Sequence, residues 1–163
     1  MEFFILVVVV YLISTLRVMF EYERGVVFML GKYTHTLQPG LKMVFWPLQT
    51  VKKVDIRVKA VDVPDQEAIT RDNISAHINA VIYYRVTDAS KSIIEVENFK
   101  YAISQLAQTT MRNIVGELTL DELLSQREQA SGKIKEIVDT LTDPWGIQVD
   151  NVELKDITLP EEM

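Results

Sequence analysis

Few side chains in this sequence combine the type and the spacing that chemistry needs. The two histidines, His35 and His77, lie in no EH, HxH or HExxH context, and a metal site needs several convergent ligands. We therefore interpret both as surface or hydrogen-bonded histidines. Cysteine is absent, which excludes disulfides, Cys-based zinc sites, thiol catalysis and S-palmitoyl anchors on Cys.

Two pairs of adjacent carboxylates, Asp121-Glu122 and Glu161-Glu162, could be read as acid–base dyads. The first pair is better explained by the first turn of a helix, where acidic side chains interact favourably with the helix dipole. The second pair is typical of a solvated tail. Nucleophile-elbow, Walker and dinucleotide-binding patterns are also missing. We therefore predict no catalytic, cofactor-binding or metal-binding residue, and a protein that is not an enzyme.

The chain begins with an uninterrupted apolar segment, FFILVVVVYLI, which contains no charge, Gly or Pro. Its residues are Phe3, Phe4, Ile5, Leu6, Val7, Val8, Val9, Val10, Tyr11, Leu12 and Ile13. A helix from residue 3 to residue 20 would be about 27 Å long, which nearly matches a hydrocarbon core of about 30 Å if Arg17 extends to the headgroups. The ten Phe, Ile, Leu and Val residues favour the bilayer by about 3 to 6 kcal/mol in total. The segment predicts a transmembrane helix over residues 1–20 that anchors the chain.

Two other interpretations of this segment are a cleaved signal peptide and a buried core strand. A signal peptide needs a basic start and a small-residue cleavage site, whereas this chain starts Met1-Glu2 and has no A-x-A-like site after Ile13. Four consecutive valines favour β structure, but strands usually run about four to eight residues. The membrane anchor agrees best with these observations.

Charges that flank the apolar segment predict how it is oriented. Arg17 and Arg24 follow the segment and Glu2 precedes it. By the positive-inside rule, this asymmetry predicts a membrane protein whose domain lies on the cytoplasmic face. The absence of Pro from the segment favours a single pass over a hairpin.

The formal charge of −6 is unevenly distributed along the chain. Residues 21–60 contain seven Lys or Arg and three Asp or Glu, a net charge of +4, whereas residues 88–163 contain seven and fifteen, a net charge of −8. Anionic headgroups attract basic residues, so the basic part suits a domain that lies on a lipid bilayer, and an ordinary solvated surface is the alternative. The acidic total argues against nucleic acid as a partner.

Residues 21–87 are patterned as strands. The predicted strands cover residues 21–30, 54–63, 67–70 and 74–86. In the first of them, Gly25 indicates a bulge or a point of close approach. In the last, Ile74 and every second residue through Val86 fall on one face, so the register is well specified.

A cluster of apolar residues, Met43 to Pro47, lies within the stretch 41–48 between the first two predicted strands. Phe45, Trp46 and Pro47 belong to it. This cluster could pack into the core, or it could make a second contact with the bilayer, because Trp prefers the membrane interface. Phe45, Trp46 and Pro47 are therefore candidate interfacial residues.

From Asp88, a good helix N-cap, the hydrophobic period becomes helical. Steps of four, three, four and four residues separate Phe99, Ile103, Leu106, Thr110 and Ile114. This spacing predicts an amphipathic helix that ends near Gly116. Capping-box patterns at 119–122 and 125–128 predict two more helices. The second of these would turn Ala130, Ile134, Ile137, Val138 and Leu141 toward the core.

Gly146 then releases the chain into a closing strand. Strands followed by helices predict an α+β fold. We divide the chain into an anchor helix (1–20), a β-rich half (21–87) and a helix-rich half with the closing strand (88–163).

Seven stretches of the sequence resemble the band 7, or SPFH (stomatin, prohibitin, flotillin), family. They read ERGVVFMLGKY, LQPGL, VDVPDQEAITRDN, AVIYYRVTDASK, VENFKYAISQLAQTTMRNIVGELTLDELLSQRE, DPWGI and VELKDITLP, and they extend from Glu23 to Pro160. Because they are dense and collinear, the chain is identified as a stomatin-like slipin of this family. The resemblance implies an anchor helix followed by an SPFH1-like and an SPFH2-like subdomain, which correspond to the two halves above.

The resemblance also implies a non-enzymatic scaffold without a cofactor. Such a scaffold forms homo-oligomers at the membrane and organises a microdomain of lipids and partner proteins. An alternative is a regulatory subunit that binds a membrane protease, an NfeD-type membrane protein or a channel. We expect neighbour contacts along residues 99–128 and 21–60, with Arg112, Arg127 and Glu128 as candidate oligomer contacts. In this family a long Ala/Glu/Arg-rich helix follows the LPEEM position and drives higher assembly, so residues 1–163 alone are not expected to form large cages.

Overall fold

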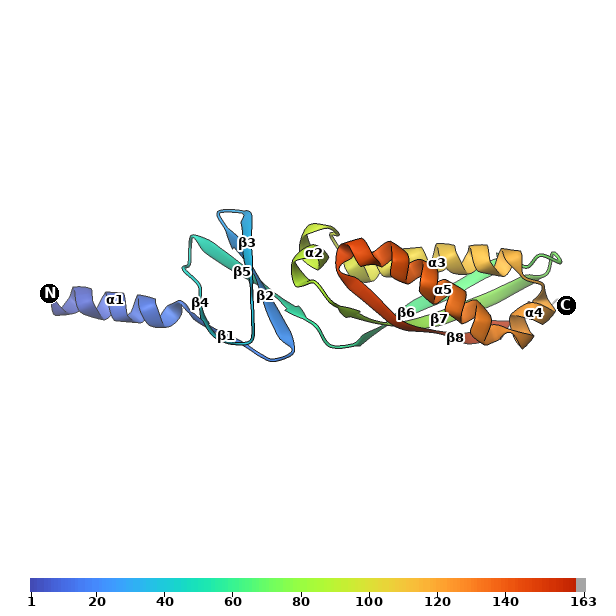
Figure 1. Ribbon diagram of the computed structural model, residues 1–163, viewed down its shortest axis with the longest axis horizontal. Helices are drawn as coiled ribbons and strands as arrows, with labels where there is room; N and C mark the ends of the chain where they lie inside the picture. The colour runs from blue at the N-terminus through green and yellow to red at the C-terminus, as the bar shows by residue number, and fades with distance from the viewer. Residues whose placement is uncertain (161–163) are drawn as a thin grey trace. The chain divides into compact units, whose positions relative to one another are not determined.

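The computed structural model describes residues 1–160 (Figure 1), and the carboxylate pair Glu161-Glu162 lies outside this range. The chain divides into two compact units that join at Arg57 and Val58. Each unit has its own strands and its own buried cluster, so each is described by itself.

The first unit contains one helix and five strands. They are α1 (Glu2–Ser14), β1 (Leu16–Met19), β2 (Glu23–Met29), β3 (Lys32–Leu37), β4 (Gly40–Met43) and β5 (Gln49–Asp55). Strands β3, β2 and β5 form an antiparallel sheet in that order, and β1 pairs with β4 in a separate antiparallel ladder. Met19, Val27, Leu37 and Val44 pack together as the core of this unit.

Gly25 in β2 is a point of close approach, as the sequence predicts. A Cβ atom at this position would lie 3.0 Å from Cγ1 of Val51, 3.2 Å from Sδ of Met19 and 3.3 Å from Cβ of Leu37. Glycine therefore lets side chains from β1, β3 and β5 close over β2. The irregularity in the register of β2 and β3 lies elsewhere, between Val27 and Phe28.

The predicted helix over residues 1–20 is wrong beyond Ser14. Helix α1 spans 13 residues, or about 20 Å at 1.5 Å per residue, and the chain then enters β1. Leu16 to Met19 pair with β4, so their backbone groups are satisfied by a ladder instead of by a longer helix. Among residues 1–160, no helix combines the length and the apolar composition that a membrane crossing requires.

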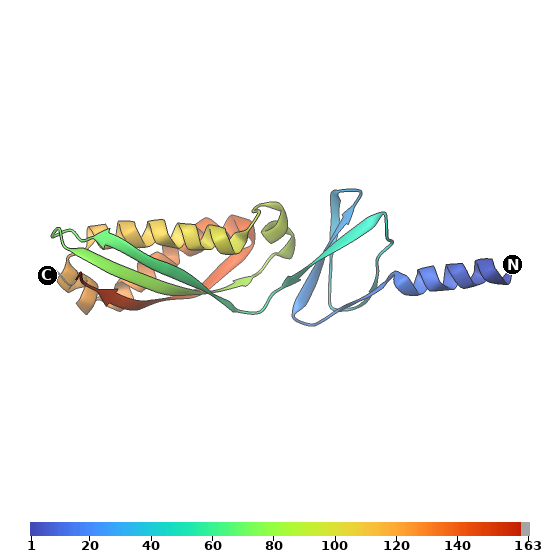
Figure 2. The same ribbon diagram turned by 180° about the vertical axis from the view of Figure 1, so that it is seen from behind.

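The second unit is a three-stranded antiparallel sheet with helices on one face (Figures 1 and 2). Its elements are β6 (Lys59–Ile69), β7 (Ser75–Val86), α2 (Ala89–Ile94), α3 (Phe99–Glu117), α4 (Leu120–Ser125), α5 (Arg127–Thr142), a 3-10 helix (Asp143–Trp145) and β8 (Ile147–Thr158). Strand β7 lies in the centre, between β6 and β8. Ile82 of β7, Met111 of α3 and Ile134 of α5 are buried in the core of this unit. Strands in the first half and helices later confirm the mixed α and β composition.

Strand β7 has the face that the sequence predicts. Ala76 and every second residue through Val86 are buried, and Ile74, which precedes the strand, is partly buried. The intervening residues are half-exposed or exposed. A slip of one residue would therefore expose the whole apolar set.

The predicted strand at 54–63 is interrupted. Strand β5 ends at Asp55 and β6 begins at Lys59, so the residues between them connect the two units. Alternation in a sequence cannot distinguish one long strand from two strands that belong to different sheets. The predicted division at residues 87 and 88 follows the change from strands to helices, whereas β6 and β7 share a core with α3 and α5.

Two details of α5 differ from the prediction. Ile137 and Leu141 are exposed at 39% and 46%, because the buried line is formed by Ala130, Ile134 and Val138 at exact four-residue steps. The capping box expected to begin at Ser125 is absent. Ser125 ends α4, where its hydroxyl donates to the carbonyl of Asp121, and α5 begins without a side-chain cap.

The buried hydroxyl of Tyr84 is expected to lower the stability of the second unit. Tyr84 is fully buried, its ring meets that of Phe99 edge-on at 5.9 Å, and its Oη has no hydrogen-bond partner among residues 1–160. Because a buried unpaired hydroxyl is unfavourable, Tyr84→Phe is expected to raise the free energy of unfolding by about 1 kcal/mol. Urea denaturation followed by the fluorescence of Trp145 measures it.

The matched control for this substitution is Tyr83→Phe, which removes a hydroxyl from the half-exposed neighbour on the other face. It is expected to change stability by less than about 0.5 kcal/mol. Burial also raises the pKa of Tyr84, so the unfolded chain releases this proton first as pH rises above about 10. The resulting alkaline loss of stability should be smaller in Tyr84→Phe, and equal alkaline sensitivity in both proteins would contradict the assignment.

Candidate functional site

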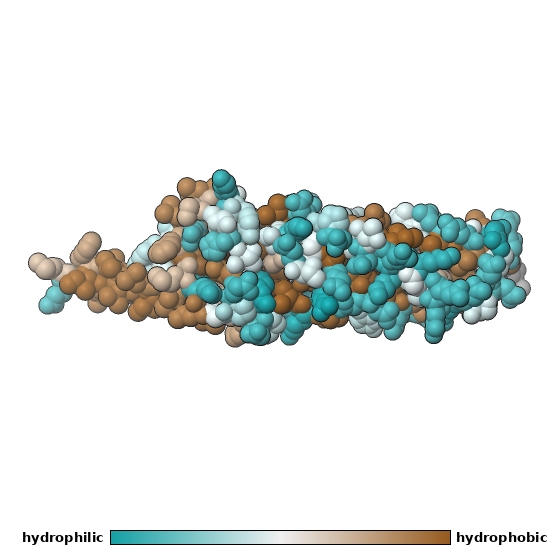
Figure 3. All heavy atoms as spheres, in the orientation of Figure 1, coloured by the Kyte–Doolittle hydropathy of each residue, from teal (hydrophilic) through white to brown (hydrophobic). Residues whose placement is uncertain are grey.

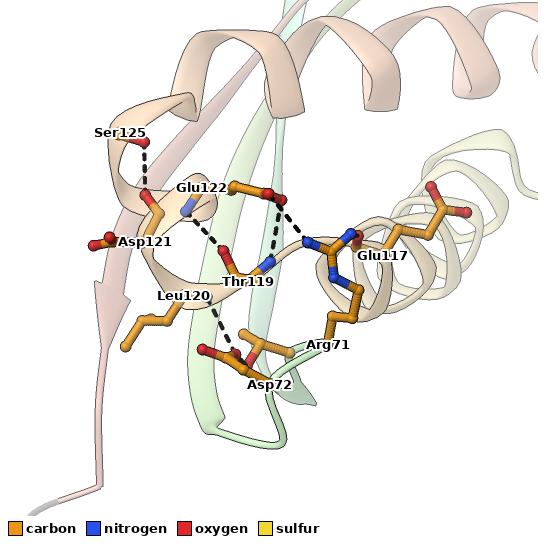
Figure 4. Close-up of polar contacts among 9 residues, drawn as sticks. Arg71, Asp72, Glu117, Thr119, Leu120, Asp121, Glu122 and Ser125 are labelled. Carbon is orange, nitrogen blue, oxygen red and sulfur yellow. Dashed lines mark hydrogen bonds and ion pairs between the residues drawn. The ribbon is translucent and has the colours of Figure 1, made fainter.

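The carboxylate pair Asp121-Glu122 belongs to the start of α4 (Figure 4). Thr119 and Glu122 form the predicted capping box, because the N–H of Glu122 donates to Oγ1 of Thr119 (3.2 Å) and the N–H of Thr119 donates to Oε2 of Glu122 (3.3 Å). Nη2 of Arg71 donates to Oε1 of Glu122 at 3.1 Å. Both oxygens of Glu122 are engaged in this way, so the pair stabilises a helix start.

The turn between β6 and β7 is tied to the same helix. Oδ1 of Asp72 accepts hydrogen bonds from the hydroxyl of Thr70 and from the N–H of Leu120. The hydrogen bond from Thr70 is the main cause that lowers the pKa of Asp72. The carboxylate therefore stays ionised at neutral pH and acts as an acceptor that holds the turn.

The two histidines belong to strands of different units. His35 is exposed on β3, and Nδ1 of His77 on β7 lies 3.9 Å from Oδ2 of Asp65. Within residues 1–160, no group of three or more His, Cys, Asp or Glu side chains is arranged to hold a metal. The polar side chains described so far stabilise turns and helix ends. The remaining candidate for a functional surface is the exposed apolar part of the first unit.

Helix α1 exposes an unbroken apolar surface (Figure 3). None of its residues is buried, and every side chain from Phe3 to Ile13 is at least 39% exposed. Large apolar side chains occur on all sides of the helix, which is typical of a helix surrounded by apolar material. Full burial of a large apolar side chain is favourable by about 1.5 to 3 kcal/mol, and the partly exposed side chains of α1 realise only part of this in water. Helix α1 is therefore suited to an apolar environment.

Hydrogen bonds occupy several polar groups at the C-terminal turn of α1. The hydroxyl of Ser14 donates to the carbonyl of Tyr11 (2.6 Å), and that of Thr15 donates to the carbonyl of Leu12 (2.6 Å). The N–H of Val44 in turn donates to the carbonyl of Thr15 at 2.7 Å. Since unpaired polar groups are costly in hydrocarbon, these bonds suit a helix end placed at the border of an apolar phase.

The ladder of β1 and β4 extends this apolar surface. Leu16 lies opposite Met43, and Val18 lies opposite Leu41, so the four side chains share one face of the ladder. All four are exposed. The other face carries the directly opposed cations Arg17 and Lys42.

The loop after β4 is an exposed apolar segment and not core. Phe45, Trp46 and Pro47 are exposed, with Trp46 at 64%, and only Val44 before them is buried. The hydroxyl of Tyr11 in α1 donates to the carbonyl of Trp46 at 2.8 Å. The structure thus excludes the core interpretation for these three residues and joins their loop to α1. Whether they contact a bilayer stays a prediction.

Sequence reasoning missed the ladder face. The residues concerned are Leu16, Val18, Leu41 and Met43. The signal that could have revealed it is the alternation of these residues with Arg17 and Lys42. We call α1, these four residues and Phe45 to Leu48 the apolar surface of the first unit.

The predicted oligomer contacts lie on the helices of the second unit. Arg112 is exposed on α3, where its Nη2 donates to Oε1 of Gln66 at 3.1 Å. Arg127 donates to the carbonyls of Leu154 and Lys155 in β8, so it fixes the start of α5 within its own chain. Glu128 is exposed beside it. The structure does not bring Arg112 together with the other two, and their role as oligomer contacts stays a prediction.

Comparisons with known proteins give a consistent result. The model of the SPFH domain / Band 7 family matches residues 18–163. The chain is 48% identical over 159 residues to an uncharacterised protein of Archaeoglobus fulgidus, which covers 98% of this chain and 64% of that protein. It is 42% identical to a stomatin homologue of Pyrococcus horikoshii (98% and 60%) and 41% identical to Stomatin-4 of Caenorhabditis elegans (91% and 53%). The chain thus spans about 60% of the length of the first two relatives.

Proposed function

This chain belongs to the SPFH domain / Band 7 family, and on that premise we propose that it is a non-enzymatic scaffold that associates with a membrane and with further copies of itself. Helix α1 inserts into the hydrocarbon of the bilayer. The second unit supplies the contacts between copies. The scaffold thereby organises lipids and membrane proteins around it.

The observation that carries this proposal is the exposure of α1. Eleven consecutive apolar residues, Phe3 to Ile13, lie in one helix and none of them is buried by the rest of the chain. Transfer of the ten Phe, Ile, Leu and Val residues among them to a bilayer centre is favourable by about 3 to 6 kcal/mol. The adjoining ladder face and the loop at 45–48 are exposed and apolar too, so the membrane contact continues beyond the helix. The stomatin homologues among the relatives support the same interpretation.

Self-association is supported by the outer face of α5 and by α3. Ile137 and Leu141 are exposed one helical turn apart on α5, and contact with a second copy would remove their apolar surface from water. The exposed cation Arg112 lies on α3. We assign the contacts between copies to these two helices.

Cross-linking of the full chain in native membranes tests this function. Wild type is expected to give a ladder of sizes that are multiples of one chain, and Arg112→Glu should shift the ladder toward the single chain because it places a repulsive charge in the contact. The effect is expected to be at least about fivefold in the fraction of cross-linked chain, which corresponds to about 1 kcal/mol.

Lys91→Glu on α2 is the matched control. Lys91 is exposed and lies outside α3 and α5, so its reversal changes the net charge equally without touching the assigned contact. A wild-type chain that stays single and is recovered without lipid would overturn the proposal. Recovery of one defined second protein in a fixed ratio would instead favour a regulatory subunit of a membrane protease, an NfeD-type protein or a channel.

A further inference from the structure

A pocket of about 400 Å³ lies beside the end of α1 in the first unit. Its polar side chains are Arg17 of β1 and Gln49, Thr50 and Lys53 of β5, and Met19 and Val44 of the core contribute to its apolar lining. A pocket that combines cations, neutral hydrogen-bond donors and an apolar floor suits a ligand with an anionic head and an apolar body.

The charges around this pocket favour an anion. Arg17 and Lys53 line it and no carboxylate does. Within residues 1–160, the guanidinium of Arg17 makes no hydrogen bond or ion pair, although a guanidinium offers five donors in a planar fork that matches phosphate. Oε1 of Gln49 accepts from the N–H of Phe45 at 3.2 Å, which leaves its amide nitrogen as a further donor.

Lys53 is the less available of the two cations. Its Nζ lies 3.8 Å from Oε2 of Glu23 and 3.5 Å from the carbonyl of Val18. The Glu23 contact is longer than a hydrogen bond, and the Lys53 side chain is 49% exposed. Lys53 therefore compensates Glu23 in part and still contributes positive potential to the pocket, while Arg17 supplies direct donors.

The position of the pocket relative to α1 indicates which anion it would meet. Val44, which lines the pocket, is hydrogen-bonded to Thr15 at the end of α1, and the carbonyl of Trp46, another lining residue, accepts from Tyr11 in its last turn. If α1 lies in hydrocarbon, this end of the helix lies at the level of the headgroups. A phospholipid whose acyl chains run along α1 would then place its phosphate beside Arg17.

We propose that this pocket binds the phosphate group of an anionic glycerophospholipid. The inference rests on the proposed membrane function and adds a lipid preference to it. Arg17 donates to the phosphate oxygens, Gln49 and Thr50 complete the polar contact, and Lys53 provides charge. The acyl chains lie against the exposed apolar side chains of α1.

Flotation of the full chain with lipid vesicles tests this site. One vesicle preparation is phosphatidylcholine alone, and the other contains about 20 mol % phosphatidylglycerol, as in anionic membranes. Wild type is expected to bind the anionic vesicles more tightly. The variant Arg17→Gln/Lys53→Gln should lose about tenfold or more of its partition coefficient on anionic vesicles and little on phosphatidylcholine.

The control Lys32→Gln/Lys52→Gln removes the same charge from exposed lysines of β3 and β5 that do not line the pocket. It should weaken anionic binding by less than about threefold, because charge attraction falls within a Debye length. Arg17→Lys/Lys53→Arg keeps the charge and should restore most of the binding. Loss of Lys53 could impair folding, because it leaves Glu23 without its nearby cation. In that case the single variant Arg17→Gln tests the site, because the guanidinium of Arg17 makes no hydrogen bond or ion pair within residues 1–160; its binding to anionic vesicles should fall.

Three outcomes separate the proposed lipid site from the proposed membrane function. Equal losses of binding to anionic vesicles in the pocket variant and in its control would overturn the site and leave only a diffuse electrostatic attraction. Wild-type binding that is the same on both vesicles would also overturn it, while membrane association would stand. Wild type that binds neither vesicle would refute the membrane function itself. Inorganic phosphate at constant ionic strength should not compete, and full competition would show a site for free phosphate and overturn the lipid assignment.

Discussion

Lysine at both Val8 and Val9 is expected to abolish the association of this chain with phosphatidylcholine vesicles. These residues lie at the middle of α1 and are exposed, so no packing within the chain is lost. Each lysine at a helix centre costs about 2.5 to 3.5 kcal/mol on insertion, or about 5 to 7 kcal/mol for two. That cost is of the same size as the 3 to 6 kcal/mol or so that the apolar residues supply, and the contributions of the two valines are lost as well. The partition coefficient measured by flotation should fall by about a thousandfold or more.

The control for these lysines is Ile69→Lys/Ile94→Lys. Both isoleucines are exposed in the second unit, so this variant has the same net charge as the α1 variant and loses the same number of exposed apolar side chains. It should bind vesicles as wild type does. Binding by the Val8→Lys/Val9→Lys variant, or an equal loss in the control, would show that α1 is not the inserted element.

The sequence was most informative where one periodicity dominates. In β7 the alternation from Ala76 to Val86 specifies a buried face, and in α3 the recurrence of Ile103, Thr110 and Ile114 specifies the face that packs on the sheet. The helix N-caps were also predicted correctly from local sequence. The side chains of Asp88 and Thr119 accept hydrogen bonds from the N–H groups three residues later.

Two of the errors below share a physical cause, because each depends on long-range pairing or packing that local pattern does not reveal, whereas the third, at Ser125, is local. Val18 is apolar and follows an apolar helix, so only its pairing with Leu41 places it in a strand. The break after Asp55 could not be predicted from the sequence, because apolar and polar residues alternate in the same way before and after it. Ser125 matches a capping box, yet its position as the last residue of α4 commits its hydroxyl to Asp121.

The candidate site shows the same division between local and long-range information. The apolar segment from Phe3 to Ile13 was evident in the sequence because it is contiguous. The pocket beside it was not, because Arg17 and Lys53 lie on strands that are far apart in the chain. Arg17 was interpreted from its sequence position as the end of a membrane segment, and the fold adds that it faces a pocket.

Gly146→Ala is expected to destabilise the second unit by about 2 to 5 kcal/mol. Gly146 has φ of +70°, in the left-handed region, and a Cβ there would lie 2.4 Å from the carbonyl oxygen of Asp88. The left-handed conformation costs alanine about 1 to 2 kcal/mol. Relief of the clash would also break the bonds that the N–H groups of Thr87 and Asp88 donate to the Gly146 carbonyl (2.8 and 3.0 Å), each worth about 0.5 to 1.5 kcal/mol. Urea denaturation followed by Trp145 fluorescence in a Trp46→Phe background measures the loss.

The control is Gly31→Ala in the first unit, whose unfolding is followed by Trp46 fluorescence. Gly31 has φ of +87°, and an added Cβ atom would lie in open space. This substitution should lower the free energy of unfolding only by the 1 to 2 kcal/mol or so of backbone strain. Equal losses at the two glycines would mean that strain alone acts at Gly146 and that its close approach to Asp88 does not hold α2 against the start of β8.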